Sequence, residues 1–248
     1  QETTMYGTDL YGKKTLHLLM KELCKIKGIR WIRVLYCYPE EIYDELIQVM
    51  KEEKKICHYL DLPIQHASDR ILKRMGRRTT RAQLTAIIEK LRKEIPDIVL
   101  RTTLITGFPG ETEADHQEVM EFVDEMEFDR LGAFTYSPEE GTPAETMEGQ
   151  IPEEVKEERR DEIMELQQEI SLEKGNDRIG QELLVMIEGK VSGESAYIAR
   201  TYGDAPKVDG YIFVQTGELL MTGDFAKVRV TGALEYDLIG ELADEYTE

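Results

Sequence analysis

The alternation between helical and strand periodicity is the feature that most constrains this fold. Up to residue 136, apolar residues repeat at helical spacing in four segments, and each is followed by a run rich in β-branched and aromatic residues. The predicted helices are 16–26, 42–50, 84–95 and 119–126, and the predicted strands are 29–38, 56–64, 98–106 and 130–136. Such alternation is typical of parallel βα units, whose ligands bind beyond the carboxyl ends of the strands. Four strands are fewer than the eight of a full barrel, so the barrel is either partial or lacks its beginning.

The periodicity changes in the last third of the chain. Residues 152–174 are densely charged with apolar residues on one face, which predicts a connecting helix. Short strands separated by glycines follow, at 183–191, 196–200, 211–215, 226–231 and 234–242. They predict a small β-barrel of the oligonucleotide-binding kind. The expected organisation is an α/β partial barrel over 1–150, a linker helix over 151–176 and an all-β domain over 177–248.

The charge and composition of the chain indicate which kinds of partner it can bind. The chain has a net charge of −19, and the segment from Asp177 onward holds six basic and fourteen acidic residues. Such a surface repels phosphate backbones and suits a basic partner, although solubility alone also explains it. The sequence has no apolar run long enough for a membrane span. Its three cysteines, Cys24, Cys37 and Cys57, are too far apart for a metal site and suggest a reducing, cytoplasmic compartment.

Polar residues and glycines gather where predicted strands end. The strand within 101–112 ends in Gly107 and Gly110, and a helix begins at Thr112, so free amides there could hold the polar groups of a nucleotide. Glu111 disfavours a phosphate and suits hydroxyl or amine groups; the simpler interpretation is a tight turn. Residues 61–68 end another strand with Gln65, His66 and Ser68, of which a single histidine is more often structural. Aromatic residues in 134–136 serve either the core or an adenine platform.

Five ordered motifs resemble those of the radical S-adenosylmethionine methylthiotransferases. They are QETTMYG at 1–7, LPIQHASD at 62–69, LKRMGR at 72–77, RTTLITGFPGET at 101–112 and FTYSPEEGTPA at 134–144. The segment from about Asp177 is similar to the TRAM domain that closes these enzymes. The resemblance implies S-adenosylmethionine and two 4Fe-4S clusters as cofactors, with the cofactor carrying the hydrogen abstraction and sulfur insertion while the protein holds it in place. The residues that the resemblance assigns to cofactor binding are Thr3, Gln65, Ser68, Arg101, Gly107, Gly110, Glu111 and Tyr136; it assigns no acid–base catalyst and no metal ligand.

One departure from the family concerns the cluster ligands. The family binds its radical-generating cluster through a Cys-x3-Cys-x2-Cys loop, which these 248 residues lack. We therefore expect the visible strands to be strands three to six of a six-strand partial barrel, with the first strands and the second-cluster domain outside the sequence. Residues 1–248 alone are predicted to bind no cluster and to be inactive.

Within the family, residues 199–210 resemble the branch that methylthiolates the β-carbon of an aspartate in ribosomal protein S-twelve. The sister branch modifies an adenosine in transfer RNA, and the acidic β-domain disfavours it. A third hypothesis is a non-enzymatic docking module built on the TRAM domain. Acidic residues near the turns of the β-domain, above all Asp204, Asp209 and Asp224, are predicted to bind the basic ribosomal protein. We expect a monomer.

Overall fold

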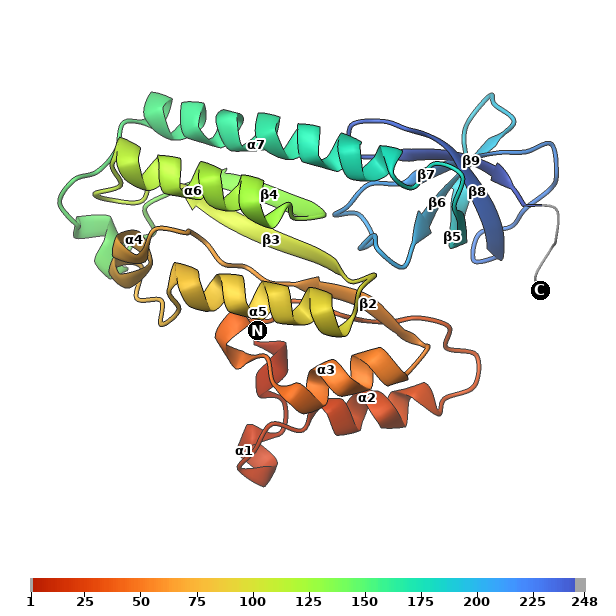
Figure 1. Cartoon of the computed structure of the whole chain (residues 1–248), viewed down its shortest axis with the longest axis horizontal. Helices are drawn as coiled ribbons and strands as arrows, with labels where there is room; N and C mark the ends of the chain where they lie inside the picture. Colours follow the sequence, from red (N-terminus) through yellow and green to blue (C-terminus); the bar gives the residue numbers. More distant parts are fainter. Residues whose placement is uncertain (1, 244–248) are drawn as a thin grey trace. The chain divides into compact units, whose positions relative to one another are not determined.

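The computed structural model describes residues 2–243, so Gln1 of the first motif lies outside the described residues. It divides the chain into two compact units, Gln1–Gln167 and Gln168–Glu248 (Figure 1). The long helix α7, Glu153–Asn176, begins in the first unit and ends in the second. The division at 151 and 177 expected for the linker helix stays a prediction.

A four-stranded parallel sheet forms the centre of the first unit (Figure 1). Its strands are β1 (Ile32–Val34), β2 (Ile56–Asp61), β3 (Val99–Thr106) and β4 (Arg130–Thr135), which pair in sequence order. The α/β partial barrel predicted from the sequence is thereby confirmed. Strand β1 is shorter than the run 29–38 at both ends, and it stops before residue 38 because Tyr36 adopts a left-handed conformation with φ of 60° and breaks the extended backbone.

The strands are connected by helices close to the predicted ones. These are α2 (Leu16–Cys24), α3 (Asp44–Glu52), α5 (Arg81–Glu94) and α6 (Glu113–Met126), with short helices α1 (Thr8–Tyr11) and α4 (Asp69–Arg74) and 3-10 turns η1 (Thr3–Met5), η2 (Pro39–Glu41) and η3 (Pro143–Thr146). Capping boxes fix where α5 and α6 begin: Thr80 exchanges hydrogen bonds with Gln83, and Thr112 does so with Asp115.

Alternation along β3 separates the core from the open face of the sheet. Leu100, Thr102 and Leu104 are buried, whereas Arg101 and Thr103 between them are half-buried. The buried Thr102 hydroxyl donates to the carbonyl of Leu62 at 2.8 Å, so its burial costs little. Because the strands are parallel, the segments after β2, β3 and β4 meet at one edge of the sheet.

The second unit contains a closed five-stranded barrel in the order β5-β6-β7-β9-β8. The strands are β5 (Glu182–Lys190), β6 (Ala196–Thr201), β7 (Ile212–Gln215), β8 (Phe225–Ala233) and β9 (Leu238–Leu242). Its core includes Val185, Tyr197 and Val228. The last strand begins at Leu238 rather than at 234, because Leu234 N–H donates to the carbonyl of Asp237 and closes a turn. The predicted small β-barrel is confirmed.

Within residues 2–243, none of the helices has both the length and the apolar character needed to cross a bilayer.

Candidate functional site

A cavity of about 480 Å³ opens where the segments after β2, β3 and β4 meet. Its walls include the apolar or aromatic side chains of Ile105, Phe108 and Phe134, together with Gln65 and Tyr136. A mostly apolar cavity with a few polar groups is the usual form of a small-molecule site. The edge of the sheet at which the sequence predicts a ligand therefore has a pocket large enough for a small molecule.

Gln65 enters this cavity from a strained backbone. Its φ is 71°, in the left-handed region. Two backbone hydrogen bonds hold it in this conformation: its amide donates to the carbonyl of Thr103 at 2.9 Å, and its carbonyl accepts from Ile105 N–H at 2.8 Å. A left-handed residue that is not glycine costs about 1–2 kcal/mol, and such strain collects at binding sites. The side-chain Oε1 of Gln65 is buried and has no hydrogen-bond partner among residues 2–243.

Tyr136 forms another part of the wall. Its ring packs edge-on against Phe108 with centroids 5.2 Å apart, and its carbonyl accepts from the Lys156 ammonium at 2.9 Å. The phenolic oxygen is buried and, in the described part of the chain, lacks a hydrogen-bond partner. An orphaned buried group costs about 1–3 kcal/mol, which a ligand that offers a partner can offset. Gln65 and Tyr136, which both line the cavity, thus each carry such a group.

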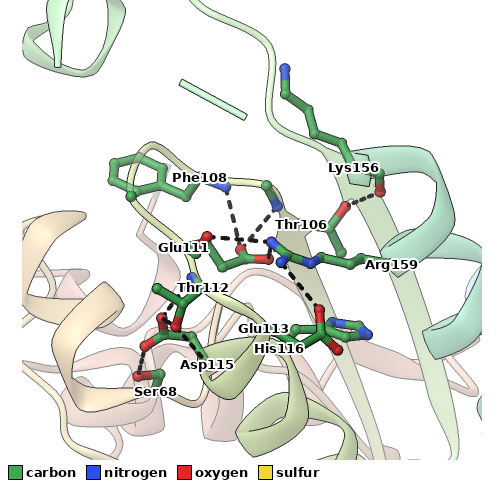
Figure 2. Close-up of polar contacts among 12 residues, drawn as sticks. Ser68, Thr106, Phe108, Glu111, Thr112, Glu113, Asp115, His116, Lys156 and Arg159 are labelled. Carbon is green, nitrogen blue, oxygen red and sulfur yellow. Dashed lines mark hydrogen bonds and ion pairs between the residues drawn. The ribbon is translucent and has the colours of Figure 1, made fainter. Parts of the chain in front are cut away.

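Glu111, in the turn after β3, is at the centre of a buried hydrogen-bond network (Figure 2). Its Oε2 accepts from the amides of Gly107 and Phe108 at 2.9 and 3.3 Å, and its Oε1 accepts from Arg159 Nη1 of α7 at 2.9 Å. The imidazole Nε2 of His66 lies 3.3 Å from Oε2. The carboxylate therefore binds the turn after β3 to the segment after β2 and to α7.

A second buried carboxylate, Asp115, orders the same edge (Figure 2). It accepts from Ser68 Oγ at 2.7 Å, from the Thr112 amide at 2.7 Å and from the Arg70 guanidinium. Burial by itself raises the pKa of the Asp115 carboxyl, but the hydrogen bonds from Arg70, Thr112 and Ser68 outweigh it and hold that pKa well below its usual range. Asp115 therefore stays charged and fixes Ser68.

The remaining sequence-predicted residues lie elsewhere in the first unit. Thr3 Oγ1 donates to the carbonyl of Leu35 at 2.6 Å, and Arg101 Nη1 donates to Asp61 Oδ1 at 3.0 Å. Gly110 accepts from Arg70 and donates to the carbonyl of Gly149. Of the eight residues assigned to cofactor binding, the structure thus brings Gln65 and Tyr136 to the cavity and places Ser68, Gly107 and Glu111 in the network beside it. Their contacts with a cofactor stay predictions.

His66 and Arg159 are parts of this site that the sequence did not single out as binding residues. His66 is a single histidine in the motif 62–69, which by itself is more often structural, and Arg159 lies in a helix crowded with charges. The signal that could have found Arg159 is its helical spacing of three from Lys156, since both side chains are buried on one face of α7.

The cysteines do not form a cluster site in the described residues. None of the three takes part in a disulfide there, and residues 2–243 contain no group of three or more histidine, cysteine or acidic residues arranged to hold a metal ion. Burial, with smaller contributions from the nearby carboxylates of Glu2 and Asp61, raises the pKa of the Cys37 thiol far above its usual range. A buried thiol of this kind does not suit the thiolate ligand that a cluster needs.

In the second unit, the predicted partner-binding acids have local roles. Asp204 is buried, and its carboxylate accepts from the amide and hydroxyl of Thr201 at 2.9 and 2.6 Å. Asp209 accepts from the Ala205 amide, and Asp224 accepts from the backbone amide three residues before it, at 2.8 Å. All three therefore order the turns in which they lie, and their role in binding a partner stays a prediction.

Comparison with known proteins adds independent findings. Residues 2–123 match the family model of the radical SAM superfamily, and residues 179–243 match that of the TRAM domain. The ribosomal protein uS12 methylthiotransferase RimO of Lachnoclostridium phytofermentans is 63% identical over 240 residues, which are 97% of this chain and 54% of the relative. The protein of the same name from Clostridium botulinum is 52% identical over 248 residues, 100% of this chain and 55% of the relative. The chain thus spans about half the length of the curated relatives it matches.

Among solved structures, coproporphyrinogen III oxidase (HemN) of Escherichia coli, a radical SAM enzyme, has the same fold. The TM-score is 0.50 at 15% identity, with 86% of this chain and 50% of that chain covered. At this level of identity, the match concerns the fold alone.

Proposed function

We propose that this chain, whose residues 2–123 match the radical SAM superfamily and whose residues 179–243 match the TRAM domain, is the barrel and TRAM part of a uS12 methylthiotransferase. The proposed reaction replaces a hydrogen on the β-carbon of an aspartate of ribosomal protein uS12 with a methylthio group. The observation that carries the proposal is the 63% identity, across 97% of the chain, to a protein named for this activity. Because this chain spans about half of that relative, the activity is proposed for the whole protein.

The cavity at the end of β3 fits the nucleoside part of S-adenosylmethionine. Ile105, Phe108 and Phe134 offer apolar surface to a purine, and the orphaned Gln65 Oε1 and Tyr136 hydroxyl offer hydrogen bonds to its polar edge or to a ribose. When bound, this cofactor supplies the hydrogen-abstracting group. The protein's part is to hold the cofactor in register and exclude water.

The iron–sulfur clusters do not fit the described residues. The superfamily match implies S-adenosylmethionine and an iron–sulfur cluster, but Cys24, Cys37 and Cys57 do not gather into a ligand set. We therefore assign no cluster ligand within residues 2–243, and the number of two clusters stays a prediction.

We propose that the basic protein bound by this acidic chain is uS12. A net charge of −19 attracts a basic protein and repels a nucleic acid backbone. We also propose that the protein is located in the cytoplasm, where ribosomal proteins are found, and that it acts as a monomer. The alternative substrate is transfer RNA, which is the substrate of the sister branch of the family.

A hybrid enzyme tests the proposed function. The matching half of the Lachnoclostridium relative is replaced by residues 1–248, and the hybrid is produced in cells that lack their own uS12 modification. We expect mass spectrometry to find a methylthio group on one aspartate of uS12. A hybrid carrying Gln65→Ala is the matched control and should give less product. Modified transfer RNA with unmodified uS12 would favour the alternative, and a folded, cluster-loaded hybrid that modifies neither would contradict the proposal.

A further inference from the structure

The two ring nitrogens of His66 have partners of opposite kinds. Nδ1 accepts the backbone N–H of Ser68 at 2.9 Å, and Nε2 lies 3.3 Å from Glu111 Oε2. Because Nδ1 is an acceptor, the proton of the neutral ring is on Nε2, the nitrogen that faces the Glu111 carboxylate. His66 is only 1% exposed, so no bulk water competes for either nitrogen. One tautomer of His66 is therefore selected by the fold.

Glu111 receives donors on both of its oxygens. The amides of Gly107 and Phe108 donate to Oε2, which also lies 3.3 Å from His66 Nε2, while Arg159 Nη1 donates to Oε1. Since every one of these partners is a donor, an acceptor on both oxygens is required, and only a carboxylate provides it. An amide at this position would turn its NH₂ toward a donor in either orientation.

These contacts set the positions of two cavity walls. Phe108 lines the cavity, and its own amide is bound to Glu111; Gln65 lines the cavity and directly precedes His66 in the chain. We propose that His66 and Arg159 are positioning residues, which act through Glu111 to hold Phe108 and Gln65 in place for the cofactor. This inference rests on the proposed function only in naming S-adenosylmethionine as the occupant.

Two substitutions of His66 distinguish a role in shaping its own turn from a role in positioning the cavity walls. In His66→Asn, the side-chain oxygen can still accept the amide two residues ahead, as in an Asx turn, but it is too short to reach Glu111. His66→Phe loses both contacts. If His66 only shapes its own turn, the asparagine variant should behave like the unchanged chain. If it positions the cavity, the asparagine variant should share most of the defect of the phenylalanine variant.

A double substitution tests the link to Arg159. In Glu111→Gln, the amide NH₂ faces either Arg159 or the backbone amides. Arg159→Met alone leaves the buried carboxylate without its cation. Combining the two removes both conflicts, because the glutamine oxygen can accept from the backbone while its NH₂ faces an apolar side chain. The double variant should therefore be less perturbed than either single variant, which a purely additive packing role would not produce.

The readouts are the affinity of residues 1–248 for S-adenosylmethionine, measured by calorimetry, and nitrogen NMR of the His66 ring. We expect the Nε2–H tautomer, and a rise in Kd of about fivefold or more in His66→Asn and in each single variant of Glu111 and Arg159. The double variant should recover most of that loss while circular dichroism shows each protein folded. An Nδ1–H tautomer, a Kd for His66→Asn within about twofold of the unchanged chain, or additive losses in the double variant would overturn the inference.

Failure of the proposed function has a different signature. If the unchanged chain does not bind S-adenosylmethionine, the cofactor assignment fails, and hydrogen exchange at the Gly107 and Phe108 amides then decides the positioning role. Faster exchange in His66→Asn and Glu111→Gln, slowed again in the double variant, would retain it. Equal exchange rates in all variants would contradict it.

Discussion

A β-carbon on Gly107 would lie 2.1 Å from Cγ of Lys156, so the turn after β3 packs directly against the aliphatic stem of a lysine in the first turns of α7. Lys156 is held there by its ammonium, which donates to the carbonyl of Tyr136 at 2.9 Å, and by its carbonyl, which accepts from Thr106 Oγ1 at 2.9 Å. The requirement for glycine at 107 thus comes from helix packing as well as from its φ of 71°. Backbone approach to a ligand, the reason suggested by the motif, is not needed to explain it.

Substitution of Gly107 by alanine should therefore destabilise the first unit. The positive φ costs about 1 kcal/mol, and the contact with Lys156 adds about 1–3 kcal/mol. Gly141 is a matched control, because its φ is 79° but a β-carbon added there would meet no atom within 4 Å. Urea unfolding should show a larger loss for Gly107→Ala than for Gly141→Ala. Equal losses would mean that Lys156 moves aside without cost.

Removal of the Tyr136 hydroxyl should separate stability from binding. The hydroxyl has no partner in the described residues, so Tyr136→Phe should leave the free energy of unfolding unchanged or raise it by up to about 1 kcal/mol. The same variant should bind S-adenosylmethionine about five- to tenfold more weakly, as calorimetry can measure. Tyr197→Phe is the contrasting variant: its hydroxyl bonds both the Glu218 carbonyl and the Leu220 amide, so it should lose about 1 kcal/mol of stability. A Tyr136→Phe protein that is clearly less stable would disprove this account.

Asp115 should make the stability of the chain depend on acid pH. Its pKa in the folded state is held well below the ordinary value of about 3.9, despite the opposing effect of burial. A depressed carboxyl pKa stabilises the fold fully above the unfolded-state pKa, and this contribution is lost as the pH falls toward the folded-state pKa. Asp115→Asn should thus cost about 1–3 kcal/mol at pH 7, and the difference from the unchanged protein should shrink below about pH 4.

Urea unfolding from about pH 7 to about pH 3 measures this difference. Asp124→Asn, at an exposed position on the same helix, is the control and should change stability by less than about 0.5 kcal/mol. A difference between Asp115→Asn and the unchanged protein that stays constant across this range would show that the shape of the side chain matters and its charge does not.

Much of the fold could be predicted because the apolar periodicities are strong. The helix near 84–95 and the strand near 98–106 carry regular patterns, and the structure has both within a few residues. The early end of β1 could not be predicted, because the run 29–38 has strand composition and the left-handed Tyr36 interrupts it. Composition and periodicity do not reveal the φ of a single residue.

The candidate site was predicted in part for the same reason. Gln65 and Tyr136 follow strand ends, which parallel topology brings together, so their meeting at one cavity could be anticipated. Arg159 comes from a helix far along the chain: its spacing from Lys156 indicates a shared face of α7, but its contact with Glu111 depends on tertiary packing. The burial of Asp204 was missed because an acid in a turn looks the same in sequence whether it faces water or caps its own backbone.

The burial of Asp204 changes how the proposed uS12 docking surface should be tested. Changing that residue to lysine would break its bonds to Thr201, so a slower association could report a damaged turn rather than lost attraction. Glu194, between β5 and β6, and Glu218, between β7 and β8, are exposed, and changing them leaves the turn-forming carboxylates intact. They are the acids with which the charge of the TRAM barrel can be altered cleanly.

We predict that Glu194→Lys combined with Glu218→Lys slows association with isolated uS12 by about three- to tenfold at low salt, and much less at about 0.5 M salt, because exposed charges act mainly on the rate of encounter. Glu89→Lys combined with Glu140→Lys is the matched control, since both glutamates are exposed in the first unit and the net charge changes equally. Stopped-flow fluorescence with labelled uS12 measures both rates. Steering by the TRAM barrel requires the first pair to be the slower one. If both pairs slow association equally, only the total charge attracts uS12, and if neither does, the substrate is held without help from these acids.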